Sequence, residues 1–88
     1  MSWNYRIVKH DKADEIYLQI HEVYYDEKND IEAYTEDPIH PFGETREELI
    51  SDLKYMLHDT EKYPVLSIMA LEEKFAAKKK NNRKTSSQ

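Results

Sequence analysis

The sequence of residues 43–57, GETREELISDLKYML, contains a helix start followed by apolar residues at helical spacing. Thr45 and Glu48 form a capping-box pattern, in which each of the two residues satisfies a backbone N–H of the other. The apolar residues of one helical stripe are Leu49, Ile50, Leu53, Met56 and Leu57. The stretch therefore predicts one principal helix. Tyr63-Pro64 is expected to end it, because the residue before a proline disfavours the α conformation.

Three stretches before this helix alternate apolar and polar residues and are rich in aromatic and β-branched types, which is typical of strands. They are residues 3–10 (WNYRIVKH), residues 15–25 (EIYLQIHEVYY) and residues 31–36 (IEAYTE). Polar residues 11–14 and 27–30 separate them, and Asn29 or Asp30 can adopt the positive φ that a tight turn needs. These segments predict an antiparallel meander of three strands.

The segments on either side of the helix complete the predicted fold. Residues 37–43, DPIHPFG, contain two prolines, which exclude a helix interior or a central strand and indicate a connector with Ile39 and Phe42 as anchors. Val65-Leu66 suits a short edge strand, and residues 67–80 suit a second helix. The predicted fold class is α+β: a three-stranded antiparallel meander packed on one principal helix, with a second short C-terminal helix.

Symmetric loops predict which residues pair across the strands. Ile7 is expected beside Leu18, and Val23 beside Tyr34. One face of the sheet then carries Trp3, Tyr5, Ile7, Ile16, Leu18, Ile20, Tyr24 and Ala33. Because a three-stranded sheet needs a partner layer, we expect the Leu49–Leu57 stripe to cover that face.

The opposite face of the sheet is expected to be free. It carries Arg6, Val8, Tyr17, Gln19, His21, Val23, Tyr25 and Tyr34. Tyrosine is enriched in protein interfaces, although strand propensity and cross-strand pairing can produce the same composition. The candidate residues for binding a protein partner, or a second copy of the chain in a homodimer, are Val8, Tyr17, His21, Val23, Tyr25 and Tyr34.

The net charge of −5 is divided unevenly along the chain. Residues 74–88 hold six of the 13 basic residues and no acidic one, so residues 1–73 hold seven basic and all 18 acidic residues, a formal charge of −11. This pattern predicts a single acidic domain over residues 1–76 and a basic, disordered tail over residues 77–88. The tail either solubilises the terminus or binds nucleic-acid phosphates through Lys78, Lys79, Lys80, Arg83 and Lys84.

No set of residues in the sequence predicts catalysis. The chain has no cysteine, which excludes disulfides, thiolate metal sites and thiol nucleophiles. His21 and Glu36 could pair across two strands, but no nucleophile accompanies them. The acidic residues of 26–37 lack the order of a calcium-binding loop. We therefore predict a non-enzymatic protein without a cofactor or metal, and a cytoplasmic one, because neither a signal peptide nor a membrane-spanning run is evident.

The order strand–strand–strand–helix resembles the N-terminal domain of HicB-type antitoxins. The motif that carries this resemblance is Gly43-Glu44-Thr45-Arg46-Glu47-Glu48-Leu49, followed by Ile50, Leu53 and Leu57. The resemblance covers residues 3–60 as topology and residues 43–57 as a motif. It implies a partial ribonuclease-H-like fold and binding to a small toxin ribonuclease.

These observations lead to one principal functional expectation and two alternatives. The principal one is a small protein-binding module that sequesters or inhibits a partner protein, as an antitoxin does. The first alternative is a phage-type acidic inhibitor of a nucleic-acid-binding machine, since a strongly acidic body can dock on a basic surface. The second is nucleic-acid binding through the basic tail.

Overall fold

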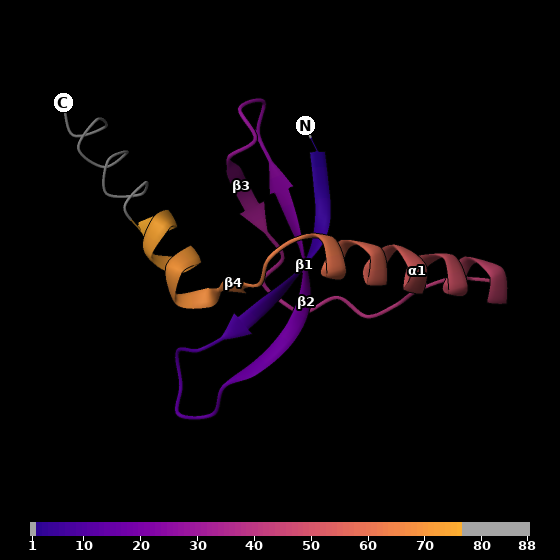
Figure 1. Cartoon of the computed structure of the whole chain (residues 1–88), viewed down its shortest axis with the longest axis horizontal. Coiled ribbons are helices and arrows are strands. Elements are labelled where there is room, and N and C mark those ends of the chain that lie inside the picture. Colours follow the sequence, from indigo (N-terminus) through magenta and orange to yellow (C-terminus); the bar gives the residue numbers. More distant parts are fainter. Residues whose placement is uncertain (1, 77–88) are drawn as a thin grey trace.

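The computed structural model describes residues 2–76, and the predicted basic tail over residues 77–88 lies outside the described residues. The elements are β1 (Ser2–His10), β2 (Tyr17–Tyr25), β3 (Ile31–Tyr34), α1 (Arg46–Lys62) and β4 (Leu66–Ser67). A second helix begins at residue 68 and continues through residue 76, the last described position. The predicted α+β class is confirmed (Figure 1).

The sheet has four strands in the order β3-β2-β1-β4: the three strands of the predicted meander and a short edge strand, which lies at Leu66–Ser67 rather than at Val65-Leu66. The fourth strand pairs in parallel with β1, with Leu66 opposite Val8 and Ser67 opposite Lys9. The other pairs are antiparallel, so the sheet is mixed. The chain reaches β4 from β3 through α1, and this crossover is what allows the parallel pairing.

The first hairpin has a longer loop than the sequence predicts, because β1 ends at His10 and β2 begins at Tyr17. The pairing therefore shifts by two residues, and Ile7 lies opposite Ile20 rather than Leu18. Side chains alternate between the faces of a strand with a period of two, so this shift leaves the residues within both strands on their predicted faces, whereas Ile16 lies before β2.

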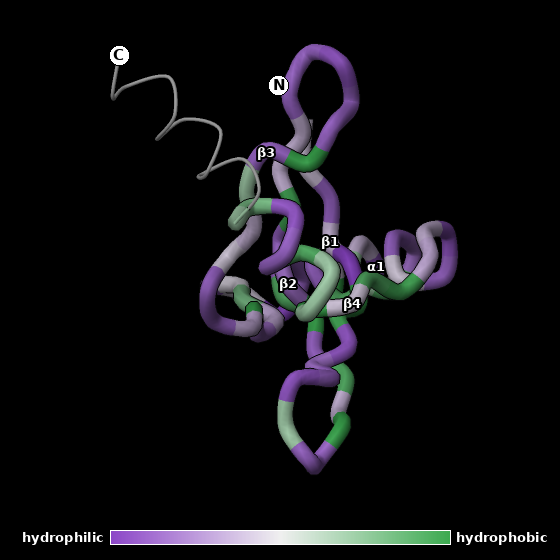
Figure 2. The backbone as a smooth tube through the Cα atoms, turned by 90° about the vertical axis from the view of Figure 1, so that its left-hand side faces the viewer, coloured by the Kyte–Doolittle hydropathy of each residue, from purple (hydrophilic) through white to green (hydrophobic). Residues whose placement is uncertain are grey.

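The second hairpin follows the predicted register up to a bulge between Tyr24 and Tyr25, where Tyr25 lies opposite Ile31. Val23 lies opposite Tyr34. Asn29 adopts a φ of 66°, and its N–H donates to the carbonyl of Asp26 at 3.0 Å to close the turn. Figure 2 shows this turn as hydrophilic, with the hydrophobic segments concentrated where β1, β2 and β4 meet.

The face of the sheet that we expected to be free forms the core of the molecule. Val8, His21 and Val23 are fully buried on it. Ile68 and Leu71 of the second helix pack against Val8, and Phe75 contacts the same cluster. The expectation of an exposed face is wrong because the second helix, rather than α1, covers it.

The loop between β1 and β2 holds the start of the second helix. The Asp11 carboxylate accepts hydrogen bonds from the Ser67 hydroxyl at 2.7 Å and from the Met69 N–H at 3.2 Å. The Ser67 hydroxyl in turn accepts from the N–H of Ala70 at 3.2 Å, which is the contact of an N-cap residue. The Ser67 hydrogen bond lowers the pKa of Asp11, so the carboxylate stays ionised. These bonds place the helix over β1.

The ends of α1 follow the sequence closely. The N–H of Glu48 donates to the Thr45 side chain at 3.1 Å, so Thr45 is confirmed as the N-cap, while the Glu48 carboxylate accepts from the Thr45 hydroxyl at 3.4 Å. The helix ends at Lys62, directly before Tyr63-Pro64. Figure 1 shows α1 and the second helix leaving the sheet in opposite directions.

The contact between α1 and the sheet differs from the prediction. It is made mainly with β1, where the Asp59 carboxylate accepts from the Tyr5 backbone N–H at 3.0 Å. Among the apolar residues of the stripe only Met56 is buried. The expectation that the Leu49–Leu57 stripe covers the sheet is therefore wrong. The short strand β4 pairs with β1 only at Val8 and Lys9, so the backbone N–H of Tyr5 has no strand partner on that side. The Asp59 carboxylate of α1 accepts from this N–H instead.

Candidate functional site

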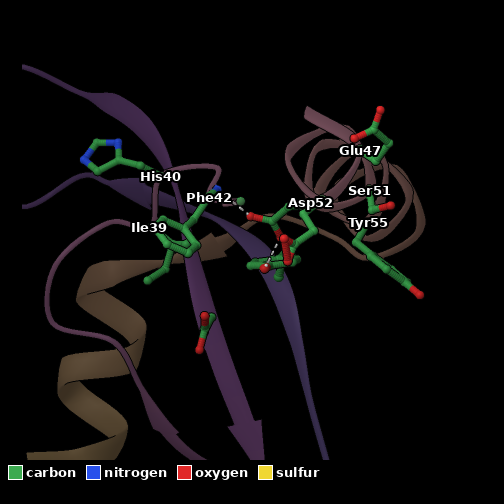
Figure 3. Close-up of a pocket in the computed structure, with 11 residues that line it drawn as sticks. Ile39, His40, Phe42, Glu47, Ser51, Asp52 and Tyr55 are labelled. Carbon is green, nitrogen blue, oxygen red and sulfur yellow. Dashed lines mark hydrogen bonds between the residues drawn. The ribbon is translucent and has the colours of Figure 1, made fainter. Parts of the chain in front are cut away.

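A cleft of about 590 Å³ lies between α1, the sheet and the connector that precedes α1 (Figure 3). It is lined by Tyr5, Glu22, Ile39, His40, Phe42, Gly43, Glu47, Glu48, Ser51, Asp52 and Tyr55. These residues come from β1, β2, the connector and the first half of α1. The cleft is shallow and broadly open to solvent.

Asp52 joins the three walls of the cleft. Its carboxylate accepts a hydrogen bond from the Tyr5 hydroxyl at 2.6 Å and another from the backbone N–H of Phe42 at 2.8 Å. Both bonds are drawn in Figure 3. Burial, and then the Asp52 hydrogen bond, raise the pKa of the Tyr5 phenol well above its usual range. The phenol therefore stays protonated at physiological pH and remains a donor to Asp52.

The connector reaches α1 through a close backbone approach at Gly43. A Cβ atom on Gly43 would lie 2.3 Å from the backbone nitrogen of Leu49. Glycine is required here for space, since its φ is not positive. Earlier in the connector, the N–H of Ile39 donates to the Ile20 carbonyl at 2.8 Å. The predicted Phe42 anchor is wrong for the side chain, which is 72% exposed, because the backbone N–H of Phe42 makes the contact instead.

The cleft is strongly acidic. Four carboxylates line it, and among the described residues no lysine or arginine does. They belong to Glu22, Glu47, Glu48 and Asp52. The Tyr24 hydroxyl donates to Glu22, which fixes the position of that carboxylate and raises the pKa of Tyr24. Carboxylates gathered in a cleft concentrate negative potential, so the site favours a cation.

Two exposed aromatic side chains line the cleft. Phe42 lines it from the connector and Tyr55 lines it from α1, and both are exposed. An aromatic face attracts a cation through its quadrupole, most often the guanidinium of arginine. The cleft thus combines charge and aromatic faces that suit the same kind of ligand.

Three of the six predicted binding residues are inaccessible. Val8, His21 and Val23 are fully buried beneath the second helix and the strands. They cannot contact a partner in this fold, although their side chains do lie on one face as predicted.

The other three predicted binding residues are held by internal contacts. Tyr34 is half-buried, and its ring centroid lies 5.6 Å from that of Phe75. The Tyr25 hydroxyl accepts from Arg6 at 2.8 Å. Tyr17 is half-exposed and stacks on His10 with ring centroids 4.8 Å apart. The six residues therefore do not form one open surface.

His21 pairs with different groups from the one that the sequence suggests. Its Nδ1 lies 2.9 Å from the carbonyl oxygen of Thr35, and its Nε2 lies 2.9 Å from Nε2 of His10. The carbonyl can only accept, so His21 donates from Nδ1 and accepts from His10 at Nε2. Burial lowers the pKa of His21 and keeps the ring neutral. This arrangement is a hydrogen-bonded core histidine rather than the proposed pair with Glu36.

The described residues hold neither a cluster of metal ligands nor a membrane-spanning helix. Across residues 2–76, no three or more His, Cys, Asp or Glu side chains converge as ligands for a metal ion. In the same part of the chain, neither helix has the length and apolar character needed to cross a bilayer.

The sequence offers one signal for the cleft that periodicity alone does not reveal. Asp52 and Asp59 are seven residues apart and lie on the side of the helix that carries Met56. Acidic residues beside the one buried apolar position indicate a helix that contacts polar groups rather than a hydrophobic sheet face. The partner groups, Tyr5 and the Phe42 backbone, cannot be identified from the sequence, because they lie far from α1 along the chain.

Comparisons with known proteins do not assign the chain to a family. No protein-family model, no curated protein and no solved structure matches it. What the protein does must therefore be inferred from its cleft, its charge and its exposed surfaces.

Proposed function

We propose that this protein is a small non-enzymatic binding module that sequesters or inhibits a partner protein, and that the cleft beside α1 receives a basic side chain of that partner. The observation that carries the proposal is the lining of the cleft: four carboxylates, exposed aromatic rings and, among the described residues, no lysine or arginine. Arginine is a common anchor of protein interfaces, and it binds carboxylates through paired hydrogen bonds.

The rigidity of the cleft supports binding over simple solvation of an acidic surface. Asp52 is held by two hydrogen bonds and Glu22 by one, so these carboxylates are fixed before a ligand arrives. Prepositioned groups lose less side-chain entropy on binding than mobile ones do. A guanidinium entering the cleft would meet these carboxylates while its flat face lies near Tyr55 or Phe42.

The charge of the whole body supports the same class of partner. Residues 1–73 carry a formal charge of −11, which attracts a basic protein over a distance and accelerates its association. A protein that binds nucleic acid presents such a basic surface. The resemblance to HicB-type antitoxins, whose partner is a small toxin ribonuclease, and the alternative of an acidic inhibitor of a nucleic-acid-binding machine both fit this chemistry.

An NMR titration of the full chain with a tri-arginine peptide tests the cleft directly. We expect saturable chemical-shift changes of the amides of Tyr5, Ser51 and Tyr55. The affinity measured from these changes should fall as the salt concentration increases. A tri-lysine peptide should bind less tightly, because an ammonium group cannot form the paired hydrogen bonds or stack.

Two charge-reversal variants provide the matched comparison. Glu47→Lys changes a cleft residue, whereas Glu73→Lys makes the same change at an exposed position of the second helix. Glu47→Lys should reduce peptide affinity by about tenfold or more, since it places a like charge in the cleft. Equal losses in the two variants would show that the peptide responds to net charge and not to the cleft.

A further inference from the structure

The side of α1 that faces away from the cleft carries an exposed apolar seam, formed by Ile50, Leu53 and Leu57. Their side chains are 39%, 47% and 59% exposed, respectively. The residues are three and then four positions apart, which is the spacing of the contact line between two packed helices. An apolar line of this kind along a stable, capped helix is typical of a helix that packs against another helix.

The described part of the chain provides no cover for this seam. The second helix packs on the other side of the molecule, against Val8. The sequence beyond the described residues, AKKKNNRKTSSQ, contains no large apolar residue that could fill the seam. The seam is therefore open to an apolar surface of another molecule.

The charges at the two ends of the seam indicate which molecule this is. Arg46 lies four residues before Ile50, and Glu61 lies four residues after Leu57, so both extend the same side of the helix. Both are exposed, and neither forms a salt bridge within the described residues. Along the helix, Arg46 lies seven residues before Leu53 and Glu61 lies eight residues after it.

We propose that a second copy of this chain covers the seam, with the two α1 helices packed antiparallel about a two-fold axis near Leu53. In that arrangement Arg46 of each copy lies beside Glu61 of the other. A parallel pair would instead bring like charges together at both ends. A two-fold axis makes the contact self-complementary and closed, so a dimer forms rather than a filament.

The proposed dimer is independent of the proposed function. The cleft is lined by Glu48, Ser51 and Tyr55, which lie on a different side of α1 from the seam. Both clefts therefore stay open in the dimer, and each can hold a basic side chain. Because the contact is made by one helix of 17 residues, it is smaller than a standard protein interface and should depend on concentration.

Sedimentation equilibrium of the full chain over a wide concentration range tests the dimer. We expect monomer at low micromolar concentration and dimer near millimolar concentration. Leu53→Lys, which places two like charges at the axis, should be monomeric throughout. The matched control is Leu18→Lys, because Leu18 is also largely exposed but lies on the sheet, and this variant should dimerise like the original chain. A chain that stays monomeric at millimolar concentration overturns the proposal.

A charge exchange tests the antiparallel arrangement. Arg46→Glu and Glu61→Arg should each weaken the dimer about tenfold, because each creates two like-charged contacts. An equimolar mixture of the two variants should restore it, since both contacts in the mixed dimer then join opposite charges. Arg46→Glu also places an acidic residue at the start of α1, where it favours the helix, so helix loss cannot explain a weaker dimer. No recovery in the mixture would contradict the antiparallel pairing.

Discussion

The two helices of this small protein have opposite relations to its core. The second helix is short, yet its Ile68 and Leu71 are buried against Val8 and complete the core. The longer helix, α1, has the clearest helical signal in the sequence but buries only Met56. A strong helical signal in the sequence therefore does not mean that a helix contributes much to the core. The cap of α1 and the hydrogen bonds from β1 stabilise this helix. Two of its sides are left exposed as a result.

The largest expected effect comes from truncating the same residue type in the two helices. Leu71→Ala should lower the free energy of unfolding by about 2–4 kcal/mol, because it opens a cavity in the core. Leu53→Ala should cost less than about 1 kcal/mol at low protein concentration, since the side chain is largely exposed. Urea denaturation measures both values. Equal losses would contradict the assignment of the core to the second helix.

The pH dependence of stability should report the buried face of the sheet. Burial lowers the pKa of His21 below the ordinary histidine value of 6.5. A histidine whose pKa is lowered on folding stabilises the folded state above the unfolded pKa, and this stability is lost as the pH falls through the folded pKa. We therefore expect the melting temperature to fall as the pH decreases from about 7 to about 5.

Two variants isolate the histidine responsible for this pH effect. His21→Gln should melt at a lower temperature at neutral pH but show a flatter pH profile over the same range. His40→Gln, which alters an exposed residue of the connector before α1, should keep the original profile. Asp11 does not interfere, because its pKa is lowered from 3.8 and it titrates at more acidic pH. An unchanged profile in His21→Gln would show that another group causes the loss of stability.

The smallest expected effect concerns the loop that positions the second helix. Asp11→Ala removes the acceptor for Ser67 and Met69, and should cost about 1 kcal/mol, as the loss of a helix cap does. Asp14→Ala, in the same loop but exposed, should be nearly neutral. Differential scanning calorimetry of the two variants measures these losses of stability. A neutral Asp11→Ala would indicate that packing on Val8 alone positions the helix.

Local features of the fold could be predicted from the sequence because they depend on neighbouring residues. The Thr45 cap, the end of α1 before Pro64 and the positive φ at Asn29 are examples, and all three are confirmed. The alternation of the strands also identified correctly which residues share a face. Strand pairing tolerates a shift of two residues without exchanging those faces.

The assignment of helices to faces could not be predicted, because it depends on contacts between distant segments. Asp11 reaches Ser67, and Tyr5 reaches both Asp52 and Asp59. Periodicity shows that a helix has an apolar side, but it does not show what that side contacts. The cleft escaped prediction for the same reason, since its walls come together only in the folded chain.

Affinity capture from the native cell, with nuclease added and at two salt concentrations, tests the proposed function most directly. The baits are the full chain, Glu47→Lys and Glu73→Lys. We predict that the full chain and Glu73→Lys retain one basic protein in stoichiometric amount, more weakly at high salt, and that Glu47→Lys loses it. Equal retention by all three baits, or recovery of nucleic acid alone, would contradict a cleft that binds a basic side chain of a protein partner.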